Sequence, residues 1–266
     1  MAANMMYTAL SGLDVFNEAL SVTSNNIANA NTTAYKSQSL DFGDMVSGLM
    51  QTAYSDDTAQ GVGATILGAT ADQSTGVEQK TNTWSDVMLQ GGGFFEVQNP
   101  TTTVDSYTRD GSFQVNSAGN LTDMGGNDVL DAKGNVINLN PPTTTPPTTY
   151  TSYSIDQSGV VYGLQANGTQ TSIAQIGVTT FSNPSALVSD GNNLFSTGVN
   201  SGAANLGTVG SGTAGTIVSG ALEMSNVDLT QQMVNLIDYQ ADYQANSKSI
   251  ATGDNILQTV VNLIQG

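Results

Sequence analysis

The sequence predicts an α+β protein, with N- and C-terminal amphipathic helices that pair as a coiled-coil-like segment around a β-rich middle. Two observations support this: apolar residues recur every seven positions at both ends, and turn-forming dipeptides punctuate the middle. We expect four parts. They are an N-terminal helix in 1–35, an extended linker or β-hairpin region in 36–80, a β-rich outer domain in 81–225 and a C-terminal helix in 226–266.

The N-terminal pattern predicts one amphipathic helix over residues 4–30. Gly12 is its one weak helix former before Ile27. Its apolar stripe is expected to contact other helices or subunits and comprises Met6, Leu10, Leu13, Phe16, Leu20 and Ile27.

The C-terminal pattern predicts a helix over residues 228–264, about 55 Å long at 1.5 Å per residue. Asp228 followed by Gln231 resembles a capping box, and Gly253 costs roughly 1 kcal/mol relative to alanine. Its expected interface residues are Leu229, Met233, Leu236, Tyr243, Ile250, Leu257, Val261 and Ile264. Such stripes are compatible with a helical hairpin buried on the chain's own core. A polar second line, at Gln240, Ser247 and Asp254, favours a narrow seam between helices instead.

Residues 60–225 carry the signals of short strands and hairpins. Turn dipeptides stand at Asp110-Gly111, Gly125-Gly126, Asn167-Gly168 and Asp190-Gly191. The Pro/Thr-rich segment NPPTTTPPTTYTS, residues 140–152, predicts an extended connector outside the fold. The Gly/Ser/Thr-rich stretch 197–218 predicts a flexible loop or a return strand.

Composition excludes several classes of function. The net charge is −17 and the five basic residues cannot form a patch that neutralises phosphates, so we expect no nucleic acid partner. Without cysteine or histidine there is no Cys/His zinc site, thiol nucleophile or Ser-His relay. No apolar run is long enough to insert into a membrane. The opening MAANMMYTALSGL lacks a secretory signal, so export would follow another route.

The remaining candidates for chemistry are weak. QGGGFFEV, residues 90–97, lacks the lysine of a phosphate-binding loop and predicts a turn with a close backbone approach. Asp123, Asp128 and Asp131 do not have calcium-loop spacing and are typical of turns. An extracellular carbohydrate-binding or hydrolytic module remains a distant alternative, with Trp84 as the one tryptophan. We therefore expect no enzymatic activity, catalytic residue, metal or cofactor.

Four segments together resemble the flagellar axial proteins, the family of rod, hook and hook-associated subunits. They are ALSGLDVFNEALSVTSNNIANANTTAYKSQ near the start, GGGFFEV, YTRDGSFQVNSAGNL, and the C-terminal segment from SNVDLTQQ to VVNLI. The family signature after the first helix corresponds to Ser24, Asn25, Asn26, Asn29, Thr32, Tyr35 and Lys36. The family's β-domain residues correspond to Gly93, Phe94, Phe95, Tyr107, Arg109, Asp110 and Gly111.

The resemblance implies a structural subunit that polymerises through its terminal helices into a helical tube around an export channel. Several segments are most like hook subunits, whereas the length is closer to distal-rod subunits; we expect a short hook-type subunit, with the distal rod as the alternative. Implied partners are further copies, neighbouring rod, hook and junction proteins, the export apparatus and the assembly cap. The implied location is the flagellar hook or distal rod.

The segment SNNIANANTTAYK, residues 24–36, is expected to be a hinge and subunit contact between the first helix and the β-rich part. Its asparagines offer uncharged donors and acceptors. The family usually has glycine where this chain has Ala34, which puts a turn with positive φ at this position in doubt.

Overall fold

The computed structural model describes residues 2–46, 61–140 and 150–265, and the chain divides into two compact units. The terminal unit contains residues 1–30, 37–72 and 227–266, and the β unit contains residues 31–36 and 73–226. The predicted α+β class, with two terminal helices in contact and a β-rich middle, is confirmed. The division differs from the expected one in two respects: residues 31–36, just after the first helix, and residues 73–80, at the end of the expected linker region, belong to the β unit.

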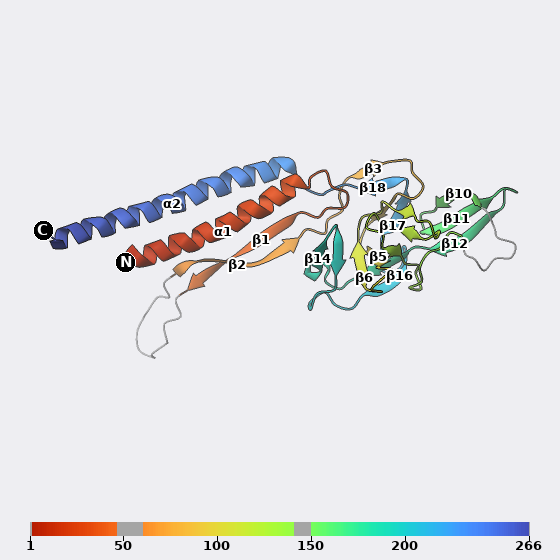
Figure 1. Ribbon diagram of the computed structural model, residues 1–266, viewed down its shortest axis with the longest axis horizontal. Helices are drawn as coiled ribbons and strands as arrows, with labels where there is room; N and C mark the ends of the chain where they lie inside the picture. Colours follow the sequence, from red (N-terminus) through yellow and green to blue (C-terminus); the bar gives the residue numbers. More distant parts are fainter. Residues whose placement is uncertain (1, 47–60, 141–149, 266) are drawn as a thin grey trace. The chain divides into compact units, whose positions relative to one another are not determined.

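The terminal unit consists of two long helices and one hairpin (Figure 1). The helices are α1 (Ala2–Ala28) and α2 (Leu229–Gln265), within two residues of the predicted bounds. Strands β1 (Gln38–Val46) and β2 (Gly61–Ala71) pair antiparallel, with Gln38 opposite Ala71. Asp228 caps α2, because its Oδ1 accepts hydrogen bonds from the backbone amides of Thr230 at 2.9 Å and Gln231 at 3.2 Å.

The β unit is built from short strands that pair antiparallel. Its strands are β3 (Glu78–Lys80), β4 (Val87–Gln90), β5 (Phe94–Gln98), β6 (Asp105–Thr108), β7 (Gln114–Val115), β8 (Leu121–Thr122), β9 (Asp128–Val129), β10 (Tyr150–Ile155), β11 (Val160–Gln165), β12 (Gln170–Gln175), β13 (Gly177–Thr180), β14 (Val188–Gly191), β15 (Leu194–Ser196), β16 (Asn205–Thr208), β17 (Thr216–Ser219) and β18 (Ala221–Glu223). A short 3₁₀ turn, η1 (Pro184–Ala186), precedes β14. The largest sheet runs β14-β15-β6-β5-β9-β8-β7, with β13 joining β5 to β16. Smaller sheets are β10-β11-β12, β17-β4 and β18-β3.

Strand β5 separates two hydrophobic clusters, because successive side chains of a strand point to opposite faces. Phe95 and Val97 lie in the larger cluster, which also contains Leu89 and Ile176. Phe94 lies in the smaller cluster with three other aromatic residues: Tyr107, Phe181 and Phe195. The GGGFFEV segment thus supplies the centre of the β unit.

Two loop predictions need correction, and a third is resolved. Residues 150–152 were assigned to the proline-rich connector but begin strand β10, since Thr and Tyr favour a pleated surface; residues 141–149 lie outside the described residues. The stretch 197–218, expected to be a flexible loop or a return strand, contains strand β16 and the start of β17, so the strand alternative is the one observed. The hairpin expected to turn at Asp190-Gly191 turns at Asn192 and Asn193, with φ of 52° and 59°.

The close backbone approach expected at the glycine run is present. Gly91 and Gly93 have φ of 114° and 115°, a conformation that side chains disfavour. A Cβ atom on Gly91 would lie 2.9 Å from the Cα atom of Gly215. At this segment the backbone around Gly91 passes close to the backbone around Gly215.

Candidate assembly surfaces and a buried ion cluster

Helices α1 and α2 run antiparallel: residues near the end of α1 contact the start of α2, and residues near the start of α1 contact the end of α2. Near the end of α1, Asn26 Nδ2 donates to Gln232 Oε1 at 3.3 Å. Further along, the rings of Phe16 and Tyr239 are 6.2 Å apart. The seam between the helices therefore combines polar and aromatic contacts.

Two glycines bring the helices close together. A Cβ atom on Gly12 would lie 2.9 Å from the side chain of Asn246, and one on Gly253 would lie 3.0 Å from that of Met6. The glycines that weaken each helix on propensity alone thus make room for residues of the partner helix. This offsets part of their cost.

The buried face of α1 consists mainly of small or polar side chains, namely Ala9, Val15, Ala19, Thr23 and Asn26. The large apolar residues of the predicted stripe are less covered: Leu10 is 49% exposed, and Met6, Leu13, Phe16, Leu20 and Ile27 are half-buried. Within the terminal unit they border the seam and leave apolar surface open.

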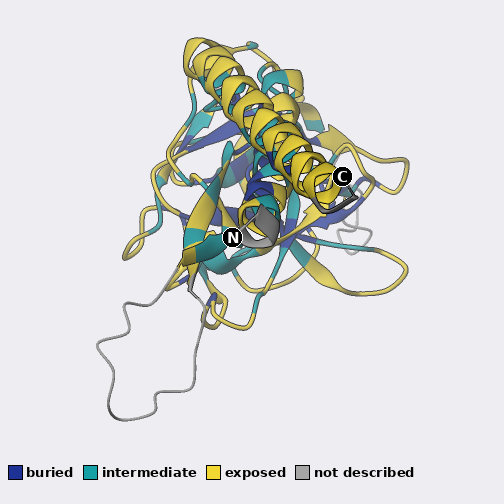
Figure 2. Ribbon diagram, turned by 90° about the vertical axis from the view of Figure 1, so that its left-hand side faces the viewer, coloured by how far each residue is buried: buried dark blue, intermediate teal, exposed yellow. Residues whose placement is uncertain are grey.

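Helix α2 exposes a long apolar surface, and Figure 2 draws most of its length as exposed. Leu236 and Ile250 are half-buried, whereas the side chain of Ile264 lies outside those described. Its large exposed residues are Leu229, Met233, Val234, Ile237, Tyr243, Ile256, Leu257, Val260, Val261 and Leu263. So many exposed large apolar side chains on one helix are typical of a protein–protein interface.

Asn26 ties the end of α1 to the start of the hairpin. Its side chain is buried and bonds both backbone groups of Gln38: Nδ2 donates to the carbonyl at 2.8 Å, and Oδ1 accepts from the amide at 3.0 Å. The other members of the motif bond locally. Asn29 donates to the carbonyl of Asn25 at 2.9 Å, and Ser24 to that of Leu20 at 2.7 Å.

The end of the same motif lies within the β unit. Ala34 is buried with φ of 55°, so the turn with positive φ is retained although glycine is missing. Its amide donates to the carbonyl of Glu223 at 2.8 Å. Thr33 bonds Asp110 at 3.1 Å and accepts at its carbonyl from Asn193 at 2.7 Å. Residues 31–36 are thus held by the β unit at several points.

Lys36, Glu223 and Arg109 form a buried ion cluster at the centre of these contacts. Lys36 Nζ lies 2.6 Å from Glu223 Oε1 and donates to the carbonyl of Ser74 at 2.7 Å. The same carboxylate oxygen accepts from the amide of Gly76 at 2.7 Å. All three charged side chains are at most 3% exposed. Two cations therefore share one carboxylate.

Arg109 is the less well-paired cation. Its Nη1 is 3.7 Å from Glu223 Oε2, and its guanidinium lies over the ring of Phe94, 5.2 Å from the centroid. Burial lowers the pKa of Arg109, and the charge of Glu223 opposes that effect. Within the described residues, Nε and Nη1 of Arg109 have no hydrogen-bond partner. Removing Glu223 would leave both cations uncompensated.

Sequence reasoning singled out Lys36 and Arg109 but missed Glu223, the residue that joins them. The available signal was an acidic residue within the small and apolar run GALEM, residues 220–224. A charged residue there is rarely buried unless paired. The lysine lies 187 positions away in sequence, so spacing could not reveal the pair.

The other β-domain motif residues have structural roles. Gly93 passes close to Val178, and Tyr107 packs edge-on against Phe181 with centroids 4.8 Å apart. Asp110 Oδ1 accepts from Ser112, while Gly111 packs directly against the backbone of Val87.

Two of the acidic residues considered for calcium, Asp123 and Asp131, cap a local turn, whereas Asp128 lies in strand β9 and is not the turn residue that was expected. Asp123 accepts from the amide of Asn127 at 2.8 Å, and Asp131 from that of Lys133 at 2.8 Å. Asp128 accepts from Asn120 at 3.1 Å. In the part of the chain that the structure describes, no three His, Cys, Asp or Glu residues gather as metal ligands. No described helix is long and apolar enough to cross a membrane.

Three family models match the chain in order along its length. The model described as flagella basal body rod protein matches residues 6–36, and the flagellar hook protein FlgE/F/G D1 domain matches residues 88–163. The flagellar basal body rod FlgEFG protein C-terminal model matches residues 218–263. The matched regions include both terminal helices and the centre of the β unit.

Similarity to rod proteins extends over the full length. The chain is 37% identical to the flagellar basal-body rod protein FlgG of Bacillus subtilis, covering 97% of this chain and 98% of that protein. It is 32% identical to FlgG of Borreliella burgdorferi, covering 97% of each. The flagellar hook protein FlgE of Escherichia coli is 43% identical over only 42% of this chain and 28% of its own length.

The chain belongs to the flagellar rod and hook protein family, a family of structural subunits rather than enzymes. The resemblance inferred from the sequence is thereby confirmed. The comparisons favour the rod alternative over the hook, because only rod proteins among these relatives are matched over their whole length.

Proposed function

We propose that this chain is a distal rod subunit of the bacterial flagellum, which polymerises with its own copies into a helical tube. The proposal is supported above all by the full-length similarity to basal-body rod proteins. The exposed apolar surface of α2 supplies a physical reason for polymerisation, because burying it would be favourable at roughly 25 cal/mol per Å².

In this proposal the two terminal helices line a central channel, and the β unit contributes the outer part of the wall. The polar residues Gln240, Gln244 and Ser247 are exposed on α2 and carry no charge. If these side chains face the channel, they would keep the channel hydrated without binding exported chains strongly. The remaining exposed apolar residues would contact neighbouring copies and transmit torque.

The partners that follow are other copies, adjacent rod and hook subunits, junction proteins, the assembly cap and the export apparatus. The subunit reaches this location by flagellar export, without a cleaved signal. All of these partners follow from the proposed position in the rod.

Electron microscopy of basal bodies from cells lacking this gene tests the proposal. We expect rods that stop short of their normal length, and restoration by the full-length chain on a plasmid. A complete rod without a hook would instead assign the chain to the hook. Complete hooks on complete rods would overturn the proposal.

A further inference from the structure

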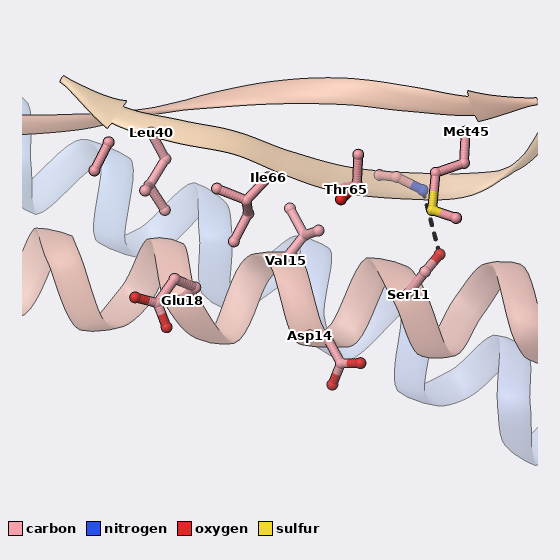
Figure 3. Close-up of a pocket in the computed structure, with 10 residues that line it drawn as sticks. Ser11, Asp14, Val15, Glu18, Leu40, Met45, Thr65 and Ile66 are labelled. Carbon is pink, nitrogen blue, oxygen red and sulfur yellow. Dashed lines mark hydrogen bonds between the residues drawn. The ribbon is translucent and has the colours of Figure 1, made fainter. Parts of the chain in front are cut away.

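A groove lies between α1 and the β1–β2 hairpin of the terminal unit. It has a volume of about 600 Å³. As Figure 3 shows, Val15 points from α1 toward the hairpin, and Leu40 and Ile66 point back from the strands. Ser11 fixes one end, because its Oγ accepts from the amide of Ala64 at 3.2 Å. The groove therefore has an apolar floor.

One edge of this groove is acidic. Asp14 and Glu18 are four residues apart on α1, both are exposed, and Figure 3 shows Asp14 directed away from the hairpin. Neither carboxylate has an ion-pair partner among the described residues. An apolar floor beside two uncompensated charges fits a helix that presents apolar residues and one cation.

The chain itself contains such a helix face. Lys248, Thr252, Ile256 and Val260 are spaced four residues apart on α2, so they lie along one side of the helix. All four are exposed, and Ile256 and Val260 are each 46% exposed. From Lys248 to Ile256 the helix rises about 12 Å, comparable to the two turns of α1 that line the groove.

The other lysines fit the groove poorly. Lys36 is buried in the ion cluster. Lys80 and Lys133 are exposed, but their sequence neighbours are Gln79 and Thr81, and Ala132 and Gly134, with no large apolar side chain. Only Lys248 combines a free charge with a stripe of large apolar residues in the described chain.

We propose that the groove between α1 and the β1–β2 hairpin binds the Lys248–Val260 stripe of α2 from a second copy, with Lys248 paired to Asp14 and Glu18. This inference rests on the proposed function, because it assumes that the chain polymerises. The two surfaces differ, so the contact is heterologous. A heterologous contact does not close as a dimer, and where its rotation does not close into a ring it generates an open helical assembly.

Disulfide cross-linking tests the contact directly, since the chain contains no cysteine of its own. Cells would produce two singly substituted chains together, Glu18→Cys and Lys248→Cys, and basal bodies would be isolated and oxidised. We expect a covalent dimer that contains one chain of each kind. Pairing Glu18→Cys with Lys133→Cys is the matched control and should give no such dimer.

Charge exchange provides the second readout. Lys248→Glu should lower the amount of chain in isolated basal bodies roughly tenfold, because it places a third acid at the acidic edge. Adding Asp14→Lys and Glu18→Lys to the same chain should restore it, and Lys133→Glu should have no effect. If the parent chain assembles but Lys248→Glu does too, and no mixed dimer forms, this contact is wrong while the proposed function stands. If the parent chain is absent from basal bodies, the proposed function itself fails.

Discussion

The two units of this protein differ in how far their large apolar residues are buried. In the β unit, Phe94 and Phe95 are at most 1% exposed, and each belongs to a closed cluster. In the terminal unit, Leu263 is 76% exposed and Ile237 is 63% exposed. The β unit buries its large apolar residues in its own core, whereas the terminal unit leaves many of its large apolar residues exposed.

This difference indicates how stability and assembly are divided along the chain. We expect a unit with a closed core to fold alone. Helices that contact each other through small residues gain much less from intramolecular packing, and isolated helices are marginal in water. Substitutions in the β unit should therefore affect stability, and substitutions in the terminal unit should affect assembly. The fluorescence of the single tryptophan helps to distinguish these two effects. Trp84 packs on the larger β cluster, 5.1 Å from the ring of Tyr153, and its fluorescence reports on the β unit.

The largest effect is expected for a charge in the exposed stripe of α2. Leu257→Asp should abolish incorporation into basal bodies, because a carboxylate would be buried between copies. Leu257 is 40% exposed in the free chain, so urea unfolding followed by Trp84 should change by less than about 0.5 kcal/mol. Asn262→Asp adds the same charge to another face of the helix and is the control. Normal assembly of Leu257→Asp would argue against the helix as an interface.

The next largest effect is expected at the ion cluster. Glu223→Ala leaves Lys36 and Arg109 buried without a counter-charge and should destabilise the β unit by about 3–5 kcal/mol in Trp84-detected urea unfolding. Glu78 is the residue opposite Glu223 in the β18–β3 pair and is exposed. Glu78→Ala should change the stability by less than about 0.5 kcal/mol. Equal stabilities of the two variants would show that the cluster contributes little.

A smaller effect is expected at Ala34, where alanine adopts a left-handed conformation. Ala34→Val should cost about 2–4 kcal/mol, because a β-branched residue disfavours this φ and the site is buried. Ala34→Gly should be nearly neutral, since relief of strain is offset by a lost buried methyl group and a more flexible unfolded chain. Thermal unfolding of the two variants measures the difference. A neutral valine variant would mean that this turn does not need its positive φ.

The sequence was sufficient for the helices because periodicity is local. Repeats such as Leu236, Tyr243 and Ile250 predict a helix whatever it contacts. The buried face of α1 was not predictable in this way, because it consists mainly of small or polar residues such as Ala9 and Thr23. Periodicity analysis gives weight to large apolar side chains, of which Phe16 meets Tyr239 at the seam whereas Leu10 stays half exposed.

Features that depend on contacts between residues far apart in the sequence could not be predicted either. Ala34 could be identified as unusual only through the family, and its turn is held by distant residues: Glu223 accepts from the Ala34 amide, and Asn193 donates to the carbonyl of Thr33. The ion cluster combines residues from three separate segments. A single sequence carries the charges but not their distances.

The smallest effect is expected at Glu96, a second buried acid of the β unit that has no cation beside it among the described residues. It lies in β5 opposite Tyr107 and accepts a hydrogen bond from Thr179. Burial raises the pKa of Glu96, the Thr179 bond opposes this, and Asp105 adds to it. A raised pKa means that the folded state favours the protonated acid. The β unit therefore loses this contribution to stability as pH rises through the raised pKa.

Glu96→Gln keeps the size and the acceptor but removes the charge. The variant should be more stable than the parent at neutral pH, by less than about 1 kcal/mol because the Thr179 hydrogen bond offsets part of the cost of burying the charge, and the difference should vanish in acid. The pKa of Tyr107, which is raised to about 12 by burial and then by the charges of Glu96 and Asp105, should fall in the variant. Tyrosinate absorbance during alkaline titration measures this second change. A stability difference that does not depend on pH, with an unchanged Tyr107 titration, would mean that Glu96 acts through its shape and not through its charge.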